Sequence, residues 1–202
     1  CALPIFDFGN DTHFFKAIQD KSSIEQLVTI FAHKKRSFEA LKIGYITSNI
    51  KGHDAKFSEF IDVCIRLLGE NWRIYGYDSD YERKSFPRSI LNFANQVYGD
   101  TNSKGNRPYL DKLYDILITK GIINLNEILL TGKNLYFKKA KAGDFKWVCS
   151  KCKTVHLHPS CGVCCNCYGK SLIKEVITKD ELENSDDYYT YLAKSAEPYR
   201  LH

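Results

Sequence analysis

Cysteines gathered in one short segment are the residues of this chain whose spacing points most directly to chemistry. Six of the eight cysteines lie in the segment WVCSKCKTVHLHPSCGVCCNC, residues 147–167. Two thiolates of a CxxC turn can reach one ion, and Zn²⁺ prefers four such ligands in a tetrahedron. The pairs Cys149/Cys152 and Cys164/Cys167 are separated by eleven residues. This spacing predicts a short zinc ribbon that holds one structural Zn²⁺.

The same segment contains other potential ligands, namely Cys161, Cys165, His156 and His158. Cys161 also forms a CxxC pair with Cys164. The pair ending at Cys167 is favoured, because Gly162 before it and Asn166 inside it both suit a tight turn. The two histidines are interpreted as polar surface residues or as residues that support the ligands.

A site closed by four cysteines has no position for a metal-bound water, so the predicted zinc is structural rather than catalytic. A redox role would need an activated thiolate at the start of a helix, and no helix is expected after Cys152. Residues 169–171, Gly-Lys-Ser, do not follow the spacing of a phosphate loop. We therefore predict no catalytic residue in the chain. Cysteines clustered in CxxC pairs, rather than spread along the chain, also indicate a reducing compartment.

Lysines surround the cysteine cluster. Residues 132–174 contain nine lysines and a single acid, Asp144, whereas residues 175–187 contain six acids and one lysine. A basic block of this kind suits a phosphate backbone. The residues predicted to contact nucleic acid are Lys133, Lys138, Lys139, Lys141, Lys151 and Lys153. The alternative is a solvated lysine-rich surface with no ligand.

The first half of the chain has the periodicity of helices and strands that could position this segment. Apolar residues recur with helical spacing over residues 24–31 and 54–68, and Gly69 is placed to end the second helix in the left-handed conformation. Residues 41–47 and 72–77 resemble strands, so residues 41–77 predict a βαβ unit. A further helix is expected over residues 87–97, followed by a linker rich in turn-forming residues at 98–108.

The second half predicts a helix over residues 110–117, closed by Gly121. The segments 128–130 and 135–137 flank Thr-Gly-Lys-Asn, which predicts a β-hairpin. A helix followed by a basic hairpin is typical of a winged helix, although any small α+β module is an equal alternative. The predicted fold class is α+β. The predicted regions are a helical or α/β region (1–100), which the resemblance given below implies is partly RecA-like, a winged-helix-like module (101–142), a zinc ribbon (143–174) and an acidic helical tail (175–202).

Three stretches resemble large superfamily 2 helicases of the DEAD/DEAH type found in bacterial phage-defence islands (the DISARM, Druantia and Dpd kind). They are Gly-Asp-Phe-Lys-Trp-Val-Cys-x-x-Cys at 143–152, Val-His-Leu-His-Pro-Ser followed by Gly-Val-Cys-x-x-Cys at 155–167, and residues 187–202. Residues 41–60 resemble, more loosely, the opening of the second RecA-like lobe. Family members commonly have small residues at positions 161 and 165, which supports the ligand set chosen above.

The resemblance implies that the chain is a fragment of a protein that hydrolyses ATP, moves along nucleic acid and serves antiviral defence. The chain itself has no Walker A motif, DEAD/DEAH box or arginine finger that can be placed, so it is not expected to be an ATPase alone. The expected function is a non-catalytic, zinc-binding accessory region of a DNA helicase. Its expected partners are nucleic acid, bound without sequence preference, and the rest of the helicase or other defence-system subunits.

The alternative is a standalone zinc-binding module for protein interactions. No apolar run approaches the ~20 residues that cross a bilayer, and no signal peptide is recognisable. A cytoplasmic location and no membrane partner are therefore expected.

Overall fold

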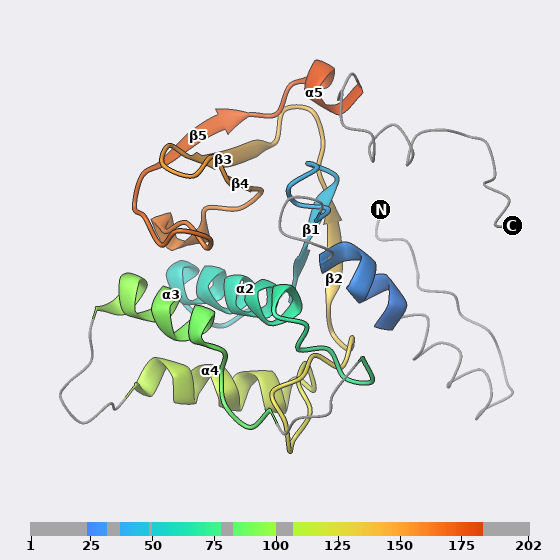
Figure 1. Cartoon of the computed structure of the whole chain (residues 1–202), viewed down its shortest axis with the longest axis vertical. Coiled ribbons are helices and arrows are strands. Elements are labelled where there is room, and N and C mark those ends of the chain that lie inside the picture. Colours follow the sequence, from blue (N-terminus) through green and yellow to red (C-terminus); the bar gives the residue numbers. More distant parts are fainter. Residues whose placement is uncertain (1–23, 32–36, 49, 78–82, 100–106, 184–202) are drawn as a thin grey trace, which may run out of the picture.

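A computed structural model describes residues 24–31, 37–48, 50–77, 83–99 and 107–183 of the chain. These residues form helices and two small antiparallel sheets (Figure 1). The elements are β1 (Gly44–Thr47), α2 (Ala55–Glu70), α3 (Arg88–Tyr98), α4 (Pro108–Thr119), β2 (Tyr136–Lys139), β3 (Phe145–Cys149), β4 (Val155–His156), the 3₁₀ turn η1 (Ser160–Gly162), β5 (Leu172–Val176) and α5 (Lys179–Glu183). A further helix covers residues 24–31. The predicted α+β fold class is therefore confirmed. Within the described ranges, no helix combines the length and hydrophobicity that crossing a membrane would require.

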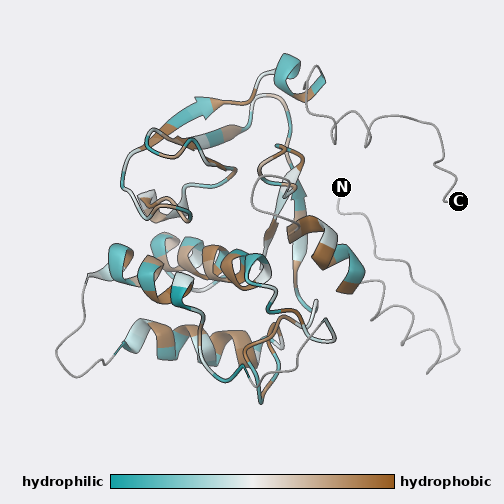
Figure 2. Ribbon diagram, in the orientation of Figure 1, coloured by the Kyte–Doolittle hydropathy of each residue, from teal (hydrophilic) through white to brown (hydrophobic). Residues whose placement is uncertain are grey.

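The larger core lies among α2, α3 and α4, whose hydrophobic residues are visible along the helices in Figure 2. Asp54 caps α2 by accepting a hydrogen bond from the backbone N–H of Phe57 at 2.9 Å. Within the core, the ring of Phe60 stacks on that of Phe93 with centroids 6.0 Å apart. Leu113 and Leu117 of α4 are fully buried in the same core. Elements on both sides of the predicted boundary at residue 100 thus pack together, and the division into domains stays a prediction.

Strand β2 pairs with β1 and not with a neighbouring segment. The two strands are antiparallel, with Tyr136 opposite Thr47. The hairpin predicted between residues 128–130 and 135–137 is therefore wrong, and the winged-helix-like arrangement that depended on it is corrected as well. Gly44 is one physical reason why β2 can pair with β1, because a Cβ at position 44 would lie 2.4 Å from the ring of Phe137. A side chain at position 44 would thus prevent this close approach of the two strands.

The predicted βαβ unit is also wrong. Residues 72–77 do not form a strand beside β1; Ile74 makes one isolated parallel bridge, to Leu130. Trp72 has a φ of 57°, which no extended strand accommodates, and its ring stacks on Tyr77 with centroids 5.3 Å apart. The backbone therefore turns within the segment that the sequence predicted to be extended.

Gly69 has a different role from the predicted one. Helix α2 continues through Glu70 and ends at Asn71 without a left-handed residue at position 69. A Cβ on Gly69 would lie 2.3 Å from the ring of Phe31. Glycine is therefore needed for the close approach of the 24–31 helix to α2, and not to end α2.

The cysteine segment forms a second sheet, in which β3 is the central strand between β4 and β5. Strand β5 pairs with β3 from Leu172 to Val176, so the predicted end of the ribbon at residue 174 falls inside a strand. The predicted acidic helical tail, 175–202, begins in the last two residues of β5 and continues into α5, and residues 184–202 lie outside the described residues. Glu181 of α5 pairs with the buried ammonium of Lys146. Burial raises the pKa of Glu181, but hydrogen bonds from Lys146 and Thr178 outweigh burial and lower it to about 2.

Candidate metal centre

Four thiols at one end of the second sheet lie close enough to share an ion. The Sγ atoms of Cys149, Cys152, Cys164 and Cys167 all lie within 4.8 Å of one another. The Cys149 and Cys167 sulfurs are 3.6 Å apart, and the Cys152 and Cys164 sulfurs are 3.5 Å apart. A Zn–S bond of ~2.3 Å implies tetrahedron edges of about 3.8 Å. The structure thus brings together the four predicted ligands in a cluster that could hold a metal ion.

The two CxxC pairs have the same backbone turn. The N–H of Lys153 donates to the carbonyl of Cys149, and the N–H of Tyr168 donates to the carbonyl of Cys164, each at 2.9 Å. Lys153 and Tyr168 directly follow the second cysteine of each pair, and both are left-handed, with φ of 61° and 58°. This reversal turns both thiols of a pair toward one point. The shared geometry makes the pair that ends at Cys167 the counterpart of Cys149/Cys152.

The two other cysteines of the segment turn toward α2 and away from the cluster. The Cys165 sulfur lies 2.7 Å from Nη2 of Arg66 and 3.1 Å from Oγ of Ser160. The Cys161 thiol donates to the backbone carbonyl of Lys56 at 3.3 Å. Burial raises the pKa of Cys161 to about 12 and that of Cys165 to about 11, so both are thiols near neutral pH. Both cysteine side chains therefore pack the ribbon against α2.

His156 and His158 are buried, so the sequence interpretation of them as surface residues is wrong. Nε2 of His156 lies 3.4 Å from the sulfur of Cys164. Burial, followed by the positive charge of Arg66, lowers the pKa of His156 to about 3. A neutral imidazole with its proton on Nε2 can donate to a metal-bound thiolate, which is the supporting role considered for it. His158 accepts a hydrogen bond from the N–H of Ser160 at Nδ1.

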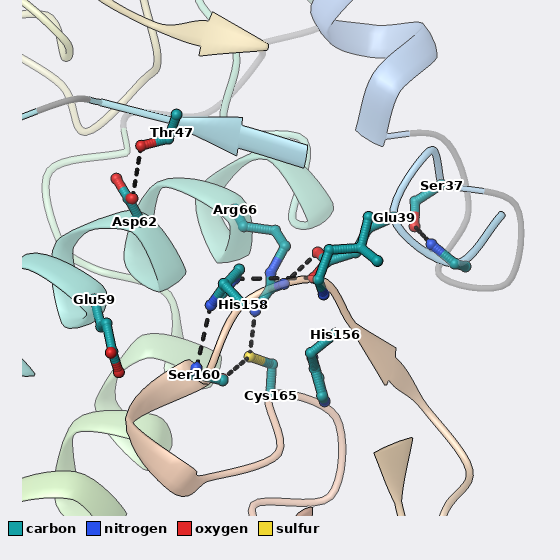
Figure 3. A network of polar contacts seen from close by, with 12 residues as sticks. Ser37, Glu39, Thr47, Glu59, Asp62, Arg66, His156, His158, Ser160 and Cys165 are labelled. Carbon is teal, nitrogen blue, oxygen red and sulfur yellow. Dashed lines mark hydrogen bonds and ion pairs between the residues drawn. The ribbon is translucent and has the colours of Figure 1, made fainter. Parts of the chain in front are cut away.

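Sequence reasoning missed a polar stripe on α2 that contacts both the cysteine segment and the end of β1. Glu59, Asp62 and Arg66 recur at i, i+3 and i+7, on a different side of the helix from its apolar stripe. The carboxylate of Glu59 accepts from the N–H of Cys161 at 3.1 Å. Asp62 accepts from the Ser48 N–H at 2.9 Å, and Figure 3 shows it directed toward the end of β1. The helical spacing of these three charged residues was a signal that could have identified them.

Arg66 is the centre of a buried network between α2 and the ribbon (Figure 3). Its guanidinium forms an ion pair with Glu39, and the two side chains are only 6% and 7% exposed. The second carboxylate oxygen of Glu39 accepts from the N–H of Leu157 at 2.7 Å. Hydrogen bonds and an ion pair thus connect residue 39 to α2 and to the cysteine segment. The residues of this network are far apart in sequence, so no local pattern predicts the pairing.

The donor set decides what chemistry the cluster permits. Four cysteine sulfurs complete a tetrahedron and leave no coordination position for water or substrate, which is the arrangement of structural metal sites. Comparison with protein-family models, curated proteins and solved structures found no match. The functional assignment therefore depends on the residues of the site and their surroundings.

The six lysines predicted to contact nucleic acid are all exposed. Lys138 and Lys139 lie on β2, and Lys141 follows in the turn to β3. Lys151 and Lys153 lie on the first CxxC turn, and Lys133 precedes β2. Lys146 from the same basic segment is buried instead and pairs with Glu175 and Glu181. The exposed charge is therefore distributed over β2, the turn that follows it and the first CxxC turn.

Proposed function

We propose that this chain is a non-catalytic, zinc-binding accessory region of an ATP-dependent helicase, and that its lysine-rich surface contacts nucleic acid. The observation that carries the proposal is the closed cluster of four thiols, together with exposed lysines on β2 and on the first CxxC turn. Zinc is the metal that best suits four cysteine sulfurs in a tetrahedron. Unpaired cysteines outside the cluster, such as Cys64 and Cys165, also suit a reducing compartment, where zinc–thiolate sites are common.

The metal has a structural reason to be present. Among the described residues, the apolar cluster beneath the second sheet has three buried members, Ala140, Leu157 and Ile177, with a few partly buried neighbours. Val163 and Cys165 of the same segment are buried in the larger core. These few side chains contribute too little to fix a segment of this size, since small units of this kind usually need a metal or disulfides. A zinc ion that joins the two CxxC turns supplies the missing stabilisation and fixes the basic residues around it.

Nucleic-acid contact is supported by the exposed lysines of residues 132–174, because Asp144 is the one acidic residue in that segment. Lysine ammonium groups on β2 and on a CxxC turn can meet phosphates without reading bases. Binding of this kind releases counterions, so affinity falls with salt by roughly 0.7 to 0.9 log units per contact and per log unit of salt. With about three to five contacts, the slope should be roughly −2 to −4.5.

The test is fluorescence anisotropy with labelled oligonucleotides at several salt concentrations. The triple variant Lys133→Glu/Lys139→Glu/Lys141→Glu should bind at least tenfold more weakly than wild type and show a shallower salt slope. The matched control is Lys51→Glu/Arg88→Glu/Lys112→Glu, which changes the net charge equally at exposed positions in the helical part. Equal losses in the two variants, or no salt dependence, would show that this surface is not a nucleic-acid interface.

A second candidate function is a zinc-binding module for protein interactions. It is favoured by exposed apolar residues on β5, where Ile173 and Val176 are 53% and 50% exposed. The same titration separates the two, because an interaction module would show no salt-dependent affinity for oligonucleotides.

A further inference from the structure

A cavity of about 280 Å³ lies where the β4–β3–β5 sheet meets the β1–β2 sheet. Aromatic rings line it from both sides. Tyr45 of β1 and His158 have ring centroids 5.4 Å apart, and Phe145 and Trp147 of β3 have centroids 6.4 Å apart. Phe145 is 46% exposed although it is a large apolar ring. The hollow therefore has exposed aromatic surface that a planar ligand could contact.

Lysine ammonium groups make cation–π contacts with three of these rings. Nζ of Lys174 lies 3.6 Å from the ring centroid of Phe145 and 5.9 Å from that of Trp147. On the opposite side, Nζ of Lys138 lies 5.6 Å from the ring centroid of Tyr45. Asp144 also lines the cavity, but its carboxylate already accepts a hydrogen bond from the N–H of Lys141. The cavity thus combines aromatic side chains with the ammonium of Lys138, and Lys174 lies beside it over the ring of Phe145.

We propose that this cavity receives an unpaired base of a single-stranded nucleic acid, with Phe145, Trp147 and Tyr45 as the stacking surfaces and Lys138 and Lys174 as phosphate contacts. The proposal rests on the proposed function and specifies its substrate as single-stranded. Every base has a π-face, so stacking on aromatic side chains tolerates any sequence, and lysines track the backbone beside it. A cavity of about 280 Å³, just below the ~300 to 1,000 Å³ range of ligand pockets, suits one base. In a duplex the base faces are already stacked and cannot enter.

The test uses the intrinsic fluorescence of Trp147. The chain has two tryptophans, so a Trp72→Phe variant leaves Trp147 as the reporter. A thymidine oligonucleotide should quench its emission, whereas an abasic strand of the same length and charge should not. The affinity of Phe145→Ala for the thymidine strand should fall about tenfold, within the range expected for one stacked base, while its affinity for the abasic strand stays unchanged. Phe145→Trp should restore binding.

The control for folding is the metal content of Phe145→Ala, which should equal that of the wild type because Phe145 is exposed and four residues from the first cysteine of the cluster. Equal wild-type affinity for thymidine and abasic strands, without quenching, would overturn the base pocket and leave the basic surface standing. Absence of binding to either strand would overturn both the pocket and the nucleic-acid function. Quenching by an aromatic peptide but by neither strand would also overturn the pocket, in favour of a protein partner.

Discussion

At the scale of single residues, the six clustered cysteines divide into two groups. Four sulfurs face one another, whereas Cys165 faces Arg66 and Cys161 faces the backbone of α2. Spacing alone does not separate Cys161/Cys164 from Cys164/Cys167. The left-handed residue after Cys167 distinguishes the two pairs, because it repeats the left-handed turn after Cys152. Position in the turn therefore decides which thiols belong to the cluster.

Cys149→Ser should lose the metal and unfold the ribbon, because in a small site metal binding is folding free energy. Cys165→Ser should retain one zinc per chain, since a hydroxyl can take the place of the thiol beside Arg66. Both are measured by metal analysis of the purified protein together with thermal unfolding. Stoichiometric zinc in Cys149→Ser would contradict the ligand set.

At the scale of elements, close packing against a glycine decides how the 24–31 helix meets α2. Helix propensity alone predicts that Gly69→Ala stabilises the protein by ~1 kcal/mol. The added Cβ would lie 2.3 Å from the ring of Phe31, which is 4% exposed and has little room to move. Overpacking of this kind costs about 1 to 3 kcal/mol. We therefore expect Gly69→Ala to lower the free energy of unfolding, by up to ~2 kcal/mol.

The control for Gly69→Ala is the same substitution in a Phe31→Ala background. Without the ring the clash is removed, so alanine should there be neutral or stabilising relative to glycine. Urea unfolding followed by circular dichroism measures all four proteins of this double-mutant cycle. A stabilising effect of Gly69→Ala in the wild-type background would show that the two helices are not in close contact.

At the scale of the whole molecule, the Glu39–Arg66 pair joins the helical part to the ribbon. Arg66→Met would leave the buried carboxylate of Glu39 without its cation, a change that costs about 3 to 5 kcal/mol. The double variant Glu39→Gln/Arg66→Met should recover a large part of that loss, because a neutral glutamine still offers a carbonyl to the N–H of Leu157. Chemical unfolding of the single and double variants measures the difference. A double variant no more stable than Arg66→Met would argue against a buried charge pair.

Metal content provides an independent readout of the same variants. Arg66→Met leaves the four cysteines in place, so the protein should still bind zinc under native conditions. Loss of zinc together with stability would indicate that the network also holds the cluster in shape, through the contact of Arg66 with Cys165.

The sequence by itself determined the features that depend on neighbours in the chain. The CxxC turns, the amphipathic helices and the basic segment are local patterns, and the structure brings the four chosen cysteines together as their spacing predicted. The fold class followed from the same local patterns.

Only the tertiary structure decided which distant segments meet. Residues 135–137 had strand character, but their partner proved to be β1 near the start of the described chain, because Gly44 admits the ring of Phe137. The pairing of Glu39 with Arg66, and the aromatic cavity between the two sheets, likewise join residues with no local relation. Long-range contacts of this kind depend on shape and burial across the whole core, and local propensity contains no information about them.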